Sequence, residues 1–274
     1  MWIGSPVRGA MRIAAYAALT LPLMPVQLAA NLLGLRGVSR WLPVYYHSAV
    51  CVLLGLKVEV IGKPSQAVPT LFVANHVSYL DIEVLSSLVP VSFVAKSEVA
   101  TWPFFKWLAK LQRSVFVERR VGATRASRED MLRRLDVGDN LMLFAEGTST
   151  DGTRVLPFRS ALLAAAELRR GGRPIVVQPV CISYRRLDGI PMGRYWRPLF
   201  TWFGDMELAR HLWQAVCLGE ASITVVFGAC TDIDEHGDRK KLTEHCFRQV
   251  SHFLQQLNRG RPIDDKPATE LQKA

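Results

Sequence analysis

A histidine and an aspartate five positions apart, His76 and Asp81, follow a short apolar run at residues 71–74. If a helix begins just after His76, Asp81 lies one turn further on and can reach the imidazole. A carboxylate bonded to one ring nitrogen fixes the tautomer and raises the basicity of the other nitrogen. The pair is therefore a candidate general base.

The sequence offers this base no nucleophile of its own. The motif G-x-S-x-G, which would place a serine on a strand-to-helix elbow, is absent, and no cysteine is near in the sequence. No H-E-x-x-H motif or second histidine at ligand spacing indicates a metal. Three interpretations stay open: a transferase whose substrate brings the hydroxyl, a thioesterase that uses water, and a structural pair in which His76 caps a helix.

A second polar segment follows another apolar run, at 141–144. It begins with an acid, a glycine and a hydroxyl side chain at 146–148, with Arg154 and Arg159 further on. The run SVFVERR at 114–120 ends in two more arginines. Backbone amides and guanidinium groups are suited to holding an anionic group. These segments predict a polar substrate site.

Four segments in this order resemble the glycerolipid acyltransferase family (1-acylglycerol-3-phosphate acyltransferase-like), whose best-known members are the lysophosphatidic acid acyltransferases. The resemblance covers about residues 55–230. One such segment is weak evidence, whereas four in order are strong. The residues that match the family's blocks are Asn75, His76 and Asp81, then Phe116, Val117, Glu118 and Arg119, then Phe144, Glu146, Gly147 and Thr148, and finally Pro179.

The resemblance implies an O-acyltransferase in which His76, held by Asp81, takes the proton from an acceptor hydroxyl that attacks an acyl thioester. Backbone amides near Gly147 would stabilise the oxyanion. The donor would be a thioester of acyl-carrier protein or coenzyme A, and we expect no further cofactor and no metal. The residues expected to bind substrate are Arg119, Glu146, Gly147, Thr148 and Arg154.

One departure from the family pattern concerns the acceptor. The third block usually carries an arginine after E-G-T, where this chain has Ser149. In the family that arginine is associated with the acceptor's phosphate. The strings EGTSTDGTRVLPFRSALL, QPVCISY and WFGDMELARHLW resemble the branch that acylates lyso-ornithine lipid. We therefore expect lyso-ornithine lipid as acceptor, with lysophosphatidic acid as the alternative because Arg154 or Arg159 could supply the missing charge.

The elements that position these side chains alternate between strands and helices. Nearly continuous apolar strands alternating with helices predict an α/β fold, in which helices flank a largely parallel mixed sheet. Ligands of such sheets bind beyond the carboxyl ends of strands, where His76 falls. Strands are expected at 58–61, 70–74, 91–95, 141–144, 175–182 and 223–227, and helices at 80–88, 103–111, 124–135, 160–169 and 239–257.

The first 56 residues differ from the rest. Residues 13–35 and 41–56 carry no charge, and the first stretch, 23 residues long, could cross a bilayer core. We expect an N-terminal membrane-associated helical pair that either spans the membrane or lies bent in one leaflet. An amphipathic pair packed on the remaining chain is the alternative. The expected division is a membrane-anchoring segment at 1–56, an acyltransferase domain at 57–257 and a flexible tail at 258–274.

Charge and cysteine content indicate the partners and the cellular location of the protein. Lys and Arg outnumber Asp and Glu by 34 to 24, a net charge of +10, which suits anionic lipid or an acidic donor such as acyl-carrier protein. Nucleic acid is not expected as a partner, because the basic residues are not interleaved with aromatics. Five cysteines without C-x-x-C spacing indicate a reducing environment. Since thioester donors are cytosolic, we expect the cytoplasmic (inner) membrane, with the active site facing the cytoplasm.

Overall fold

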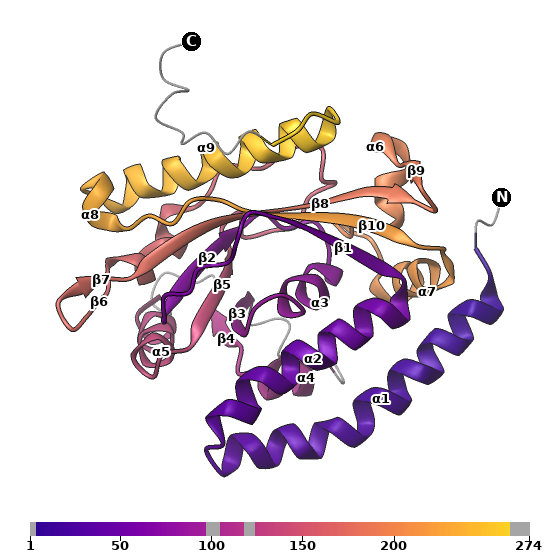
Figure 1. Cartoon of the computed structure of the whole chain (residues 1–274), viewed down its shortest axis with the longest axis horizontal. Coiled ribbons are helices and arrows are strands. Elements are labelled where there is room, and N and C mark those ends of the chain that lie inside the picture. Colours follow the sequence, from indigo (N-terminus) through magenta and orange to yellow (C-terminus); the bar gives the residue numbers. More distant parts are fainter. Residues whose placement is uncertain (1–3, 97–104, 118–123, 264–274) are drawn as a thin grey trace.

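The computed structural model describes residues 4–96, 105–117 and 124–263, so the predicted site residue Arg119 and most of the expected tail lie outside the described residues. One sheet runs through the molecule with helices on both faces (Figure 1), in the order β1-β10-β8-β2-β5-β3-β4, and β9 pairs with β8. The strands are β1 (Leu56–Ile61), β2 (Thr70–Ala74), β3 (Val91–Lys96), β4 (Val115–Val117), β5 (Asn140–Phe144), β8 (Val176–Leu187), β9 (Ile190–Pro191) and β10 (Ala221–Phe227), with a separate hairpin of β6 (Arg169–Arg170) and β7 (Arg173–Pro174).

Helices flank the sheet in two layers. The long helix α9 covers one face together with α5, whereas α2 and α3 lie on the other face, with α1 outside them (Figure 1). The predicted helix at 160–169 is a 3₁₀ helix, η2 (Ser160–Glu167). The other helices are α1 (Pro6–Leu32), α2 (Arg36–Leu54), α3 (Leu80–Ser86), α4 (Phe105–Leu111), α5 (Thr124–Asp136), α6 (Gly193–Trp196), η3 (Arg197–Leu199), α7 (Leu208–Cys217), α8 (Ile233–His236) and α9 (Arg239–Asn258).

The sheet is mixed but largely parallel, as predicted. Strand β2 lies between β5 and β8 and is parallel to both, and β10 pairs antiparallel with β8. All five residues of β2 are buried. Parallel strands that are covered on both faces appear in the sequence as continuous apolar runs, and this pattern predicts the strand. The α/β prediction is confirmed. The carboxyl end of β2 lies in the interior of the sheet, between β5 and β8.

Pro179 lies at a position that is unusual for proline, which in sheets is mostly confined to edge strands and bulges. Its strand, β8, lies inside the sheet, between β2 and β10. However, β10 ends at Phe227, which pairs with Val180, so Pro179 sits just beyond the end of that neighbour. There its carbonyl accepts from the amide of Gly228. A proline is tolerated because the missing N–H is not needed by a continuing ladder.

Helices α1 and α2 form an antiparallel pair that packs tightly on the sheet domain. The guanidinium of Arg12 donates to the carbonyls of Val216 and Leu218, at 3.2 and 2.7 Å, where α7 ends. The amides of Gln27 and Asn31 donate to the carbonyl of Leu111 at the end of α4, at 3.2 and 2.9 Å. The pair is thus bonded to the domain along its length.

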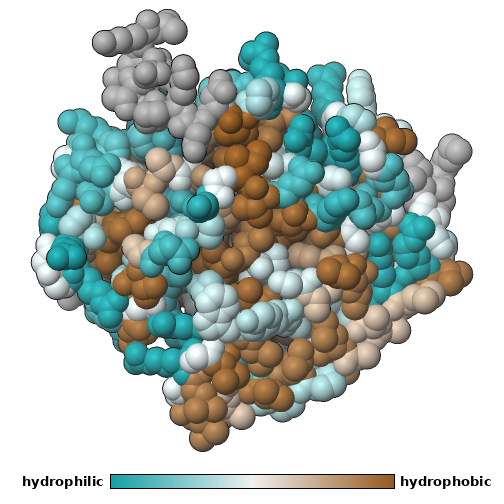
Figure 2. Space-filling model, viewed as in Figure 1, coloured by the Kyte–Doolittle hydropathy of each residue, from teal (hydrophilic) through white to brown (hydrophobic). Residues whose placement is uncertain are grey.

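The outer face of the same pair is apolar and exposed. Figure 2 shows apolar residues gathered along the lower margin, where Figure 1 places α1 and α2. Within the described part of the chain, α1 is the one helix long and apolar enough to cross a membrane. The exposed large apolar residues of the pair are Val7, Met11, Ile13, Leu21, Val26, Leu28, Leu32, Leu33, Leu35, Val38, Trp41, Tyr45 and Val52.

A buried polar pair connects α2 to α3, the helix that carries Asp81. His47 Nδ1 lies 2.5 Å from Glu83 Oε2, and His47 Nε2 lies 3.0 Å from Gln112 Oε1. Gln112 in turn donates to Ser86 Oγ at 2.6 Å. Only 8% of the His47 side chain and 17% of that of Glu83 are exposed. The pair therefore couples the position of α3 to that of the N-terminal helices.

We expect Glu83→Ala to lower the free energy of unfolding by about 3 kcal/mol, because breaking a buried pair leaves the other partner unsatisfied. Glu83→Gln keeps a hydrogen-bonding group at the same place and should cost less. Thermal unfolding of the two variants beside the unaltered chain measures the difference. An unchanged melting temperature for Glu83→Ala would contradict the coupling.

Candidate active site

His76 and Asp81 meet in the loop between β2 and α3, as their spacing predicts. His76 Nδ1 lies 2.8 Å from Asp81 Oδ2. The carboxylate of Asp81 is fully buried, and 21% of the His76 side chain is exposed. When Nδ1–H donates to the carboxylate, Nε2 keeps its lone pair and can take a proton. The geometry is that of a positioned general base.

Asp81 also accepts three further hydrogen bonds. The backbone amides of Val77 and Ser78 donate to Oδ2 at 2.8 and 3.0 Å, and the hydroxyl of Tyr184 donates to Oδ1 at 3.0 Å. Four donors on one buried carboxylate stabilise its charged form, which offsets the cost of taking it out of water. These contacts fix the carboxylate in the position from which it orients His76.

Tyr184 was not predicted as a site residue. It lies on β8, 103 positions from Asp81 in the sequence, and its side chain is 2% exposed. Burial and the neighbouring Asp81 charge raise its pKa well above the usual value, so the hydroxyl stays protonated and donates. Its contact with Asp81 depends on β8 lying beside β2, which local sequence patterns do not reveal.

Glu146 positions His76 by binding the main-chain amide of that residue. Its Oε1 accepts from the amide of His76 at 2.8 Å, and its Oε2 accepts from the amide of Leu156 at 2.7 Å. The amide of Thr150 donates to the His76 carbonyl at 2.9 Å. Glu146 is only 2% exposed. Both carboxylate oxygens thus hold backbone amides, which positions the loop of His76. The predicted substrate contact of Glu146 stays a prediction.

Part of the predicted anion-binding loop is already hydrogen-bonded within the protein. Gly147 has φ +69°, a left-handed conformation that glycine adopts without strain. Its amide donates to the carbonyl of Phe144 at 3.0 Å, so this amide is not a free oxyanion donor. Thr148 and Ser149 beside it are half-buried. They remain the members of the predicted loop that a substrate can approach.

The two arginines that follow this loop lie in different places. Arg159 approaches Gly147, where its Nε lies 3.4 Å from the position a β-carbon would occupy. Arg154 is exposed and lines a cavity of about 630 Å³ against α9, together with Phe247 and Arg248. Of the two, Arg159 is therefore the cation beside the site loop. The predicted substrate contact of Arg154 stays a prediction.

Aromatic packing and an amide restrain the histidine further. The ring of His76 stacks on Phe144 with centroids 4.0 Å apart and an interplanar angle of 17°, and Phe93 stacks behind Phe144. The side chain of Asn75 exchanges two hydrogen bonds with the backbone of Ile182 on β8, at 3.0 and 2.9 Å. The loop after β2 is thus held on both sides before any substrate binds.

Comparisons with known proteins identify the family. A family model described as Acyltransferase matches residues 57–183. A lyso-ornithine lipid O-acyltransferase of Brucella abortus is 44% identical over 257 residues, covering 92% of this chain and 96% of that protein. This chain belongs to the acyltransferase family. The predicted resemblance is confirmed. The first, third and fourth sequence blocks lie on β8 and at the carboxyl ends of β2 and β5, beside the dyad, whereas Arg119 of the second block lies outside the described residues.

Two further similarities are to a named relative and to a solved structure. A 1-acyl-sn-glycerol-3-phosphate acyltransferase of Neisseria gonorrhoeae is 31% identical over 227 residues, covering 77% of this chain and 82% of that protein. The crystal structure of the 1-acyl-sn-glycerophosphate acyltransferase from Thermotoga maritima covers 93% of this chain with a TM-score of 0.58 at 20% identity. The latter supports the fold alone. An enzyme of this family acting on lipid, with the apolar α1 at its surface, associates with a membrane.

We expect His76→Ala to reduce the turnover of acyl transfer by a factor on the order of 10²–10⁴, the usual contribution of a positioned general base. The melting temperature should change little, because the imidazole is partly exposed. Turnover and thermal unfolding of the same purified variant measure both effects. Near-normal turnover would make the dyad structural.

A second prediction concerns the pH dependence of stability. Burial raises the pKa of Glu146 to about 7 from 4.5, although its two backbone hydrogen bonds act in the opposite direction. Between these two pH values the folded chain keeps a proton that the unfolded chain has lost. The contribution of Glu146 to stability therefore falls as pH rises through this interval and is constant above it.

The variant Glu146→Gln cannot titrate at this position. Its melting temperature should decline less between about pH 5 and about pH 7 than that of the unaltered enzyme. Thermal unfolding across this interval gives the difference between the two curves, in which the other titrating groups cancel. A difference that changes in the opposite direction would show that the folded chain favours the charged form of Glu146.

Proposed function

We propose that this acyltransferase moves a fatty acyl group from a thioester to the hydroxyl of lyso-ornithine lipid. The observation that carries the proposal is the 44% identity to the Brucella abortus enzyme over nearly the whole of both chains. The relative named for a glycerophosphate acceptor is less similar, at 31%. Ser149 agrees with this choice, because it puts a neutral hydroxyl where the family pattern has a phosphate-associated arginine.

The proposed reaction needs no covalent enzyme intermediate. His76 Nε2 removes the proton from the acceptor hydroxyl while its oxygen attacks the thioester carbonyl, and Asp81 stabilises the imidazolium that forms. When the tetrahedral intermediate collapses, the carbon–sulfur bond breaks and the thiolate takes the proton from His76. The products are a new ester and a free thiol. Water in place of the acceptor would give the thioesterase reaction.

The acceptor headgroup is proposed to contact the loop that includes Thr148 and the nearby Arg159. An ornithine headgroup carries a carboxylate, with which a guanidinium pairs in the same way as it pairs with a phosphate. The position of Arg159 beside Gly147 therefore also supports the second candidate acceptor, lysophosphatidic acid. The number of cations at the loop, reduced by Ser149, favours the acceptor with the smaller negative charge.

We also propose the donor and the location. Acyl-carrier protein and coenzyme A are both acidic, which complements a chain of net charge +10. Both donors are cytosolic, so the site would face the cytoplasm from the cytoplasmic (inner) membrane. The exposed apolar face of α1 and α2 would hold the enzyme there.

A side-by-side assay of the two lyso-lipids, with acyl-carrier protein thioester as donor, tests the acceptor. Lyso-ornithine lipid should give the higher kcat/KM. Losing one charge-assisted contact costs about 1.5–3 kcal/mol, or roughly 10- to 150-fold in affinity for the phosphate acceptor. Accordingly, Ser149→Arg should improve the use of lysophosphatidic acid.

Controls separate the remaining outcomes. A reaction without acceptor measures hydrolysis, and thiol release at the same rate with and without lyso-lipid would identify a thioesterase. A higher kcat/KM for lysophosphatidic acid in the unaltered enzyme would reject the acceptor assignment. If Ser149→Arg left the preference unchanged, the link between this position and the acceptor would be wrong.

A further inference from the structure

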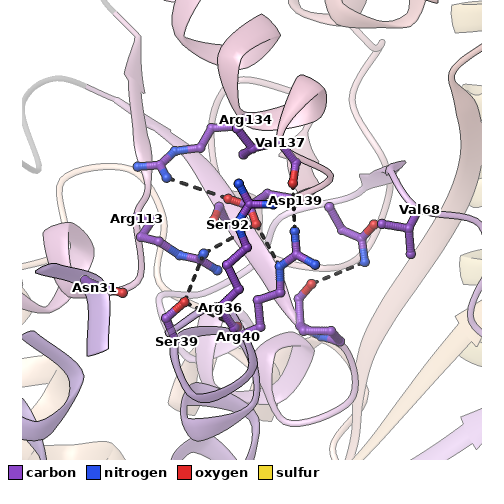
Figure 3. A network of polar contacts seen from close by, with 12 residues as sticks. Asn31, Arg36, Ser39, Arg40, Val68, Ser92, Arg113, Arg134, Val137 and Asp139 are labelled. Carbon is purple, nitrogen blue, oxygen red and sulfur yellow. Dashed lines mark hydrogen bonds and ion pairs between the residues drawn. The ribbon is translucent and has the colours of Figure 1, made fainter. Parts of the chain in front are cut away.

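A cluster of arginines lies where the amino-terminal ends of the strands meet the start of α2. Figure 3 shows Arg40, Arg113 and Arg134 converging on Asp139, which directly precedes β5. Their nearest nitrogens lie 3.0, 3.3 and 3.6 Å from its carboxylate oxygens. Three guanidinium groups on one carboxylate leave two positive charges uncompensated. The side chain of Asp139 is only 4% exposed.

Two more arginines enlarge this excess of charge. Arg170 reaches the same place from the β6–β7 hairpin: it and Arg40 each lie 3.4 Å from the position of a β-carbon on Gly138. Arg36, one turn before Arg40 on α2, is exposed and forms no ion pair within the described residues. Asp136 is nearby in the sequence and likewise exposed, but it pairs with none of these arginines. Among the described residues, the carboxylate that forms ion pairs with the cluster is that of Asp139.

Arg113 is the most buried of the three arginines, with 16% of its side chain exposed. Its φ of +59° belongs to the turn that ends α4, in which the amides of Arg113 and Ser114 donate to the carbonyls of Lys110 and Ala109. Its Nε is buried without a hydrogen-bond partner among the described residues. Burial lowers its pKa, and the charges of Arg134 and Arg40 act in the same direction, against the effect of Asp139. The contacts of Arg113 with described residues thus leave its positive charge only partly compensated.

The cluster adjoins the part of the N-terminal pair that is most apolar and exposed. The connection between α1 and α2, which we call the hairpin tip, carries Leu32, Leu33 and Leu35, exposed by 78%, 72% and 49%. Arg36 follows Leu35 directly, and Trp41, 50% exposed, follows Arg40. Exposed leucines beside arginines and a tryptophan match the boundary between acyl chains and headgroups in a bilayer.

We propose that Arg36, Arg40, Arg113 and Arg134 bind the phosphate of an anionic phospholipid in the membrane on which the enzyme sits. The hairpin tip would enter the acyl-chain region, and the arginines would then lie at the depth of the phosphates. Guanidinium groups bind phosphate oxygens through paired, charge-assisted hydrogen bonds. An acidic protein partner would explain the arginines but not the three exposed leucines beside them.

This lipid site is separate from the catalytic site. Asp139 precedes β5, whereas His76 follows β2, which is parallel to β5 and in register with it. The two sites therefore lie at opposite ends of the strands. They are separated by the length of a five-residue strand, roughly 16 Å. A phospholipid held at the arginine cluster is a membrane contact and not the acceptor that reacts at His76.

The test is binding of the full-length enzyme to vesicles of phosphatidylcholine with and without phosphatidylglycerol. The double variant Arg36→Gln with Arg134→Gln removes two cluster charges and leaves Asp139 paired with Arg40 and Arg113. Each arginine lost should reduce partitioning onto the anionic vesicles by about fivefold. Binding to the neutral vesicles should change little.

A matched control removes the same two charges elsewhere. Arg248→Gln with Arg261→Gln alters exposed residues on or just after α9, on the opposite face of the sheet from α1 and α2 (Figure 1). This variant should keep its preference for anionic vesicles. Equal losses in both double variants would reduce the effect to net charge and overturn the proposal, as would no loss in the cluster variant.

Removing the carboxylate tests the proposal with the opposite sign. Asp139→Asn eliminates the one negative charge among the arginines, so folded protein should bind anionic vesicles more tightly than the unaltered enzyme. If the arginines serve only to clamp α2 onto Asp139, this variant should lose stability in thermal unfolding without any gain in binding, which would contradict the proposal.

Two further measurements identify the ligand and distinguish a failure of this proposal from a failure of the proposed function. Inorganic phosphate at constant ionic strength should not release the enzyme from anionic vesicles; release would assign the cluster to free phosphate instead. Acyl transfer in neutral detergent should be unchanged in the Arg36→Gln, Arg134→Gln variant. Loss of turnover there would place the cluster in the catalytic machinery and overturn its assignment as a membrane contact.

Discussion

The buried carboxylate of Asp81 is the constraint on which the site depends. An ionised group that is fully removed from water is tolerated only when hydrogen bonds replace its hydration. The chain meets this requirement with two amides of the loop after β2, the imidazole of His76 and the hydroxyl of Tyr184. Because the donors come from different elements, the loop, α3 and β8 must all be in place for the histidine to be oriented.

Two buried carboxylates at this site do different work because their donors differ. Asp81 contacts the imidazole itself, and so acts on the basicity and orientation of the ring. Glu146 contacts only backbone amides, those of His76 and Leu156, and so ties two loops together. Burial raises its pKa to about 7, against the effect of these two hydrogen bonds. An acidic side chain in a family motif can therefore fix the geometry of a site.

The N-terminal helices combine the two alternatives that were considered for them. They are bonded to the catalytic domain through Arg12, Gln27 and the His47–Glu83 pair, and they also expose a long apolar face. The His47–Glu83 pair joins these helices to α3, the helix that carries Asp81.

Features that depend on short-range spacing could be predicted from the amino-acid sequence. Five positions between His76 and Asp81 place both groups at one strand-to-helix turn, and buried parallel strands read as apolar runs whatever their neighbours. Strand order is not encoded in such patterns. Three contacts follow from tertiary packing instead: Tyr184 reaches Asp81, Glu146 faces backbone amides, and Arg159 rather than Arg154 lies beside Gly147. These contacts join residues whose proximity results from β8 packing beside β2 and from loops folding back, and no local periodicity records that.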